Sequence, residues 1–176
     1  TAEVGDPGIN TLVSGTLNIT ASGNNGFGVY RVINNTNGGS INISNRSIVN
    51  LERDTLKVNS ITINEATQGV NIQSDQIVGN LSLSTSAGNT STTFIRSLVL
   101  TGNASYTLNG TSIFYDTYLI GTSNSYSGNV SYTRNANGPT NIAFYATNNY
   151  GGNVTINGTV PASIDAFEKG SNITGN

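Results

Sequence analysis

The chain has 176 residues, which is enough for one domain with a core of its own. Its formal net charge is only -2, and its seven Lys and Arg residues are scattered along the sequence. This argues against nucleic acid or an anionic membrane surface as a partner, because both are bound by clustered basic residues. Cys and His are absent, which excludes a disulfide framework, a thiolate nucleophile and an imidazole ligand.

The chain also lacks any apolar run of the roughly 20 residues that a membrane-spanning helix needs, so we expect no membrane-spanning segment. Thr1 is not an initiator residue. We therefore expect a mature chain whose signal segment has been removed, or a fragment of a larger protein.

The first strongly patterned stretch is "SGTLNITASG", which runs from Ser14 to Gly23. Together with Val13, it alternates apolar and polar residues without interruption, and this alternation predicts a β-strand with one face buried. The residues of the apolar face are Val13, Gly15, Leu17, Ile19 and Ala21.

Further along, short apolar pairs with a period of two recur to the end of the chain, separated by turns rich in Gly, Asn and Ser. The clearest pairs are Ile41 and Ile43, Ile61 and Ile63, Val70 and Ile72, Leu81 and Leu83, Val130 and Tyr132, and Val154 and Ile156. The pattern predicts an all-β protein.

Two all-β architectures fit this pattern. Segments such as "VGNLSLS", "SGNVSYT" and "GGNVTIN" recur about every 20 to 26 residues, which is typical of a right-handed parallel β-solenoid. The same spacing also suits hairpins in a sandwich, and "FIRSLVL" and "SIFYDTYLI" are apolar on both faces. Because the repeat length drifts and the candidate core positions do not match in detail, we favour an Ig-like or pilin-like β-sandwich and keep the solenoid as the alternative.

The carboxylates offer little for catalysis. Glu52 and Asp54 in "LERD" are the only close pair expected on one face of a strand, and no base, nucleophile or ligand set accompanies them. We therefore predict no enzymatic activity, no metal site and no cofactor. A carbohydrate-active enzyme on β-coils is the function class that this absence disfavours.

The motif N-x-S/T is unusually frequent, and it is the acceptor signal for N-linked glycans. Alternation in strands also produces it, because residues i and i+2 share a face. Several copies fall in expected turns, where a glycan is tolerated. The glycosylation candidates are Asn34, Asn80, Asn89, Asn103, Asn109, Asn129 and Asn157.

"SGTLNITASG" resembles the N-terminal extension of chaperone-usher (type 1-like) pilins, which completes the incomplete sandwich of the next subunit. In a chain without Cys, poor in Lys and rich in sequons, it is similar to the subunit of the archaeal thread, a glycosylated filament. The resemblance implies that Val13, Leu17 and Ile19 are the inserted side chains and that Gly15 is the small residue beside them. Bacterial type 1 pilins usually hold a disulfide, which this chain lacks.

These observations lead to one functional hypothesis and one alternative. Residues 1–23 are expected to be an extension with a donor strand, and residues 24–176 a sandwich domain. The chain would be an extracellular, cell-surface filament subunit that pairs head-to-tail with identical copies, serving adhesion or biofilm scaffolding. The alternative is a β-solenoid passenger fragment of a bacterial autotransporter adhesin, whose first strand pairs within its own chain.

Overall fold

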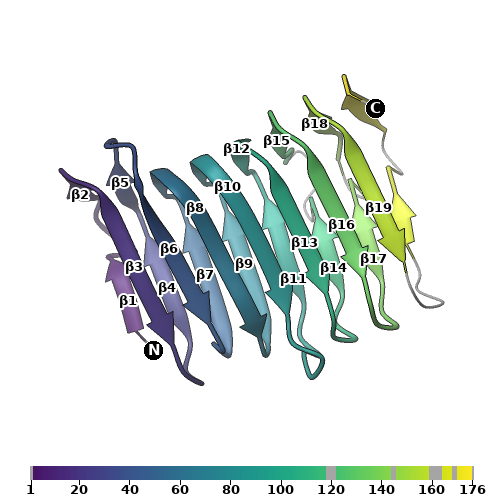
Figure 1. Ribbon diagram of the computed structural model, residues 1–176, viewed down its shortest axis with the longest axis horizontal. Coiled ribbons are helices and arrows are strands. Elements are labelled where there is room, and N and C mark those ends of the chain that lie inside the picture. Colours follow the sequence, from purple (N-terminus) through teal and green to yellow (C-terminus); the bar gives the residue numbers. More distant parts are fainter. Residues whose placement is uncertain (1, 118–121, 144–145, 159–163, 168–169, 176) are drawn as a thin grey trace.

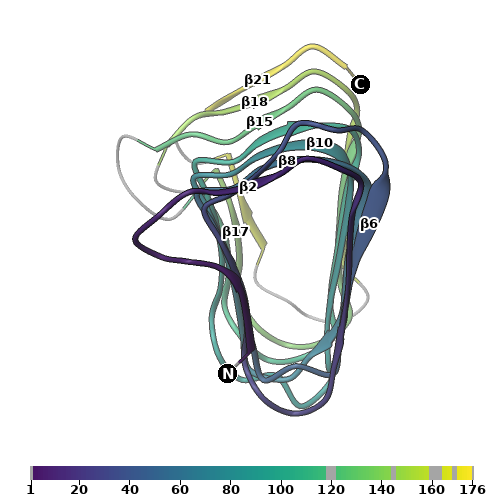
Figure 2. The ribbon, with the colours of Figure 1, turned by 90° about the vertical axis from the view of Figure 1, so that its left-hand side faces the viewer.

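The structure is a computed structural model that describes residues 2–117, 122–143, 146–158, 164–167 and 170–175. Its strands stack side by side from one end of the molecule to the other (Figure 1). Viewed along the stack, the chain winds around a three-sided outline (Figure 2). We name the sides face A, face B and face C in the order in which the chain crosses them.

Face A is an eight-stranded sheet in which every registered pair is parallel. Its strands are β1 (Ala2–Gly5), β4 (Phe27–Tyr30), β7 (Ile48–Glu52), β9 (Gly69–Gln73), β11 (Thr93–Arg96), β14 (Phe114–Asp116), β17 (Thr140–Ile142) and β20 (Ile164–Ala166).

Faces B and C belong to one 13-stranded sheet, because two long strands bend from one face to the other. The bending strands are β8 (Thr55–Ala66) and β10 (Gln76–Thr85). Face B also holds β2 (Thr11–Val13), β5 (Val32–Asn34), β12 (Val99–Thr101), β15 (Ser125–Tyr126), β18 (Asn148–Tyr150) and β21 (Ser171–Ile173). Face C also holds β3 (Leu17–Ser22), β6 (Gly39–Ser44), β13 (Ala104–Leu108), β16 (Val130–Arg134) and β19 (Val154–Gly158).

The all-β prediction is confirmed, and the architecture is the parallel β-solenoid that was the alternative; the Ig-like sandwich was wrong. The repeat of 20 to 26 residues is the length of one coil, and it drifts because the corner loops differ in length. The doubly apolar segment "FIRSLVL" crosses a corner rather than forming one strand. Ile95, Leu98 and Leu100 all point inward because the chain turns between β11 and β12.

The strand assigned to a neighbouring subunit instead pairs within its own chain. Leu17–Ser22 forms β3, which runs parallel to β6 with Ile19 opposite Ile41. Leu17, Ile19 and Ala21 are buried in the chain's own core, whereas Val13 and Gly15 lie partly exposed before the strand. The described part of residues 1–23 thus belongs to the same solenoid as the rest, not to a separate extension.

Like residues stack along the core, one per coil. One interior column of face C reads Ile19, Ile41, Ile61, Leu81, Ala104 and Val130. The coils before β11 bury mainly aliphatic side chains, whereas the later coils bury Tyr106, Phe114, Tyr126, Tyr132 and Tyr150. Each fully buried apolar side chain stabilises the fold by roughly 1.5–3 kcal/mol, so the stacked columns supply most of the driving force.

The corner from face A to face B uses a left-handed residue in successive coils. The residues are Arg31, Arg53, Ser74, Ser97, Thr117, Ala143 and Phe167, with φ between 50° and 74°. This conformation reverses the inward and outward alternation within one residue. It disfavours residues with a Cβ, which makes these corners strained positions that glycine would relax.

We expect Ser74→Gly to raise the free energy of unfolding by about 0.5–1 kcal/mol, since Ser74 is exposed with a φ of 60° and glycine relieves its strain. The matched control is Ser82→Gly, which removes the same exposed side chain from β10 and should destabilise by a similar amount. Urea denaturation followed by circular dichroism measures both. A loss of stability in Ser74→Gly would contradict the strain.

Candidate functional site

The predicted glycosylation sites divide into two groups in the structure. Asn34 and Asn89 were both predicted glycosylation sites, Asn89 within an expected turn, but both side chains are fully buried. The Nδ2 of Asn34 donates to the carbonyl of Lys57 at 3.4 Å, and that of Asn89 donates to the carbonyl of Ala66 at 2.8 Å. An amide nitrogen held this way inside the wall is not open to a glycan, so these two assignments are corrected.

The other candidates lie nearer to solvent. Asn109 is half-buried, and its Nδ2 donates to the carbonyl of Thr85 at 2.8 Å. The exposed candidates are Asn80, Asn103, Asn129 and Asn157. For these, glycosylation stays a prediction.

Three of the exposed asparagines form a ladder at the corner between faces B and C. The Oδ1 of Asn80 accepts the backbone N–H of Asn103 at 3.0 Å, and the Oδ1 of Asn103 accepts that of Asn129 at 2.9 Å. Each asparagine follows a stacked glycine of the same corner and precedes an inward apolar residue and an outward Ser. The coil repeat therefore explains the sequon pattern at these positions.

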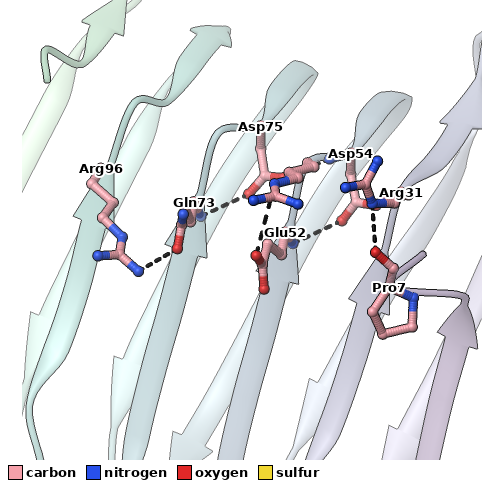
Figure 3. A network of polar contacts seen from close by, with 8 residues as sticks. Pro7, Arg31, Glu52, Asp54, Gln73, Asp75 and Arg96 are labelled. Atoms are coloured by element: carbon pink, nitrogen blue, oxygen red, sulfur yellow. Dashed lines mark hydrogen bonds and ion pairs between the residues drawn. The ribbon is translucent and has the colours of Figure 1, made fainter. Parts of the chain in front are cut away.

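Glu52 and Asp54 do not form the same-face pair expected from the sequence. Arg53 between them has a φ of 60°, which turns Glu52 outward and Asp54 inward. Glu52 instead forms an ion pair with Arg53 at 3.9 Å between Oε1 and Nε. The two carboxylates lie on opposite sides of the wall, so they do not share a surface at which a substrate could bind (Figure 3).

Asp54 belongs to a buried polar column that links successive coils. Its Oδ1 accepts the N–H of Val32 at 2.7 Å, and the Oδ1 of Asp75 accepts the N–H of Asp54 at 2.8 Å. Asn124 and Asn148 occupy the same position in later coils and accept the N–H groups of Leu98 and Asn124, both at 2.9 Å. The side chains satisfy backbone donors that the corner leaves without a strand partner.

Burial dominates the electrostatics of this column. It raises the pKa of Asp54 from an ordinary 3.8 to about 7, although the N–H groups of Val32 and Glu52 partly offset it. Burial also raises the pKa of Asp75 well above its ordinary value, and the charge of Asp54 adds to this. The two acids act as structural acceptors inside the wall.

A third buried acid, Asp116, stands in an otherwise aliphatic column of face A, opposite Ile95 and Ile142. Its carboxylate accepts hydrogen bonds from the hydroxyls of Tyr126 at 2.9 Å and Tyr150 at 3.2 Å, and also from Tyr132 and from the Nδ2 of Asn124. Desolvation raises the pKa of Asp116, while these four donors lower it. Within the described part of the chain, Asp116 and the three tyrosines are all buried in the core.

Among the described residues, the outward positions along the face C strands carry only neutral polar side chains, and the exposed charge nearest to them is Glu65 at the end of β8. Its positions are Asn18, Thr20 and Ser22 in β3, Ser40, Asn42 and Ser44 in β6, Ser60, Thr62 and Asn64 in β8, Asn80, Ser82 and Ser84 in β10, Ser105 and Thr107 in β13, Ser131 and Thr133 in β16, and Thr155 and Asn157 in β19. Strands in a sheet are about 4.8 Å apart, so like charges stacked at this spacing would repel. Short neutral side chains avoid that cost and still form hydrogen bonds, such as Asn42 Nδ2 to Ser40 Oγ at 3.1 Å.

A shallow hollow of about 300 Å³ runs across β10, β13 and β16 on this face. It lies between the asparagine ladder and the outward serines Ser82, Ser105 and Ser131. Sequence alternation identified these residues as polar positions, but only the parallel register shows that they form one continuous surface. We take the outward surface of face C as the candidate functional site.

Within the described residues, no three His, Cys, Asp or Glu side chains approach closely enough to bind a metal ion. The same part of the chain contains no helix of membrane-spanning length and hydropathy. No protein family, curated protein or solved structure matches the chain.

Proposed function

We propose that this chain is a non-catalytic β-solenoid segment of an extracellular surface adhesin, comparable to the passenger of an autotransporter. The observation that carries the proposal is the outward surface of face C, a continuous neutral array of Asn, Ser and Thr. Such a surface is hydrated and forms hydrogen bonds without depending on pH or salt, which suits contact with hydroxylated material outside the cell.

The placement of the acids supports a structural role. Asp54, Asp75 and Asp116 are buried and accept hydrogen bonds from backbone or tyrosine donors. We do not propose a filament assembled by donor strands, because β3 is part of the chain's own sheet.

Two measurements on native material test this function. An antibody against the chain should label intact source cells, and external protease should release the signal. Electron microscopy of the released material should show isolated rods. Labelling that requires permeabilised cells would contradict a surface role, and head-to-tail filaments would favour the pilus hypothesis instead.

A further inference from the structure

The outer side of face A carries a groove of about 310 Å³ that is separate from face C. Its hollow lies at Gly69, which has no side chain and pairs with Ile48 in β7. Ile48 is 44% exposed and forms one wall. Phe94 and Arg96 of β11 form the opposite wall, so three successive coils contribute to the groove.

Phe94 gives this wall an aromatic surface of fixed orientation. Its ring stacks on Tyr115 with a centroid distance of 5.7 Å and an interplanar angle of 5°. On the side of Phe94 away from Tyr115, the register places Asn71 of β9. The groove therefore combines an aromatic wall with an amide next to it.

Arg96 gives the groove a positive charge that the described residues do not neutralise. Its Nη2 donates to the Oε1 of Gln73, which is a neutral amide (Figure 3). Among the described residues, an ion pair forms between Glu52 and Arg53, and Arg96 takes no part in it. Arg96 is the one charged residue among those that line the groove.

Two further polar atoms of this wall lack a partner. The Nε of Arg96 and the Oδ1 of Asn71 are buried without a hydrogen bond in the described part of the chain. A buried polar atom left unpaired costs about 1–3 kcal/mol. An occupant that supplied an acceptor to the guanidinium and a donor to the amide would remove this cost after small side-chain rotations.

We propose that this groove binds an acidic sugar, a uronate residue of an anionic polysaccharide. The carboxylate accepts hydrogen bonds from the Arg96 guanidinium, and the apolar C–H face of the ring packs on Phe94. Gln68, Asn71 and Ser91 line the groove and provide neutral hydrogen-bonding groups for the sugar hydroxyls. A neutral sugar would leave the charge of Arg96 unmatched, and a bare phosphate would not use the aromatic wall.

This inference deepens the proposed function and rests on it only for the source of the polysaccharide. Binding is measured on the purified chain, whereas the proposed function is tested on intact cells. A chain that binds uronate but is absent from the cell surface would overturn only the proposed function. A surface-exposed chain that does not bind uronate would overturn only this inference.

The experiment is titration calorimetry with trigalacturonate and with its methyl ester, which has the same ring without the charge. We expect the acid to bind at least about tenfold more tightly than the ester, because the ester loses the charge-assisted hydrogen bond. Inorganic phosphate should not compete at equal concentration. Equal affinity for acid and ester, effective competition by phosphate, or no binding of the acid would overturn the inference.

Two variants locate the site. Arg96→Gln should weaken trigalacturonate binding about tenfold or more, while Arg53→Gln removes the same charge from an exposed corner and should leave binding unchanged. If Arg96→Gln does not fold, Ser91→Asp places a negative charge on an exposed residue of the rim and should abolish binding, with Ser74→Asp as its control. Unchanged binding in a folded Arg96→Gln or in Ser91→Asp would overturn the assignment.

Discussion

Gly102→Ala is expected to lower the free energy of unfolding by roughly 3 kcal/mol or more. Gly102 has a φ of 148°, and a Cβ at this position would lie 2.1 Å from the carbonyl oxygen of Gly79 in the preceding coil. That oxygen belongs to backbone, so it cannot move without displacing the stacked corner. The strained backbone conformation and the steric overlap of the new Cβ therefore both lower the stability of the variant.

The stacked glycines make this effect specific to the corner between faces B and C. A Cβ on Gly128 would lie 2.4 Å from the carbonyl oxygen of Gly102, so the tight packing continues into the next coil. Gly88→Ala is the matched control, because a Cβ added to Gly88 would have no heavy atom within 4 Å and the residue has no unusual φ. Chemical denaturation should show a change of less than about 0.5 kcal/mol for Gly88→Ala. Similar stabilities for the two variants would contradict the role of the corner.

The protein is expected to be more stable at pH 4.5 than at pH 8. Asp54 has a pKa of about 7 in the fold and an ordinary value of 3.8 when unfolded, so the folded state binds more protons between these values. Stability therefore falls as pH rises through this window, and it gains nothing further from Asp54 below 3.8. The shift in the pKa of Asp54 changes the free energy of unfolding by about 4 kcal/mol at most across this pH range. Asp75 changes it in the same direction.

Asp54→Asn tests the origin of this pH dependence. Asn124 and Asn148 already occupy the same buried column, so the substitution keeps the acceptor for Val32 while removing the charge. The variant should show a flatter pH profile, with a gain relative to the wild type at pH 8. Asp165→Asn removes an exposed charge and should leave the profile parallel to that of the wild type. Denaturation curves at pH 4.5, 6 and 8 measure all three proteins, and a wild type that loses stability on acidification would contradict the argument.

Period-two alternation placed the interiors of many strands correctly, because inward and outward positions alternate in any sheet. Ile41 and Ile43, for example, are buried in β6 as expected. Alternation does not distinguish parallel from antiparallel neighbouring strands. The sandwich was therefore favoured although the strands of the chain are parallel. The recurring "GN" steps carried the missing information, since they mark the corner at which glycines and asparagines stack.

The errors at individual residues have a different cause. The left-handed corner falls on Arg53 and Ser74, which carry no glycine signal, so the reversal that separates Glu52 from Asp54 was not apparent from residue types. The groove on face A was also not found, because Gly69 and Phe94 come from different coils. Only the parallel register of β9 and β11 places Asn71 beside Phe94.

The coil-by-coil pairing of strands has a consequence for how the chain acquires its structure. Each strand pairs with the equivalent strands one coil before and after it, so every pairing closes a loop of nearly constant length, however long the stack becomes. Stability and folding are then governed by nearest-neighbour coupling, as in other solenoids. A chain emerging from a ribosome can add one coil at a time to an already ordered template, with the edge of the most recently folded coil as the growing end.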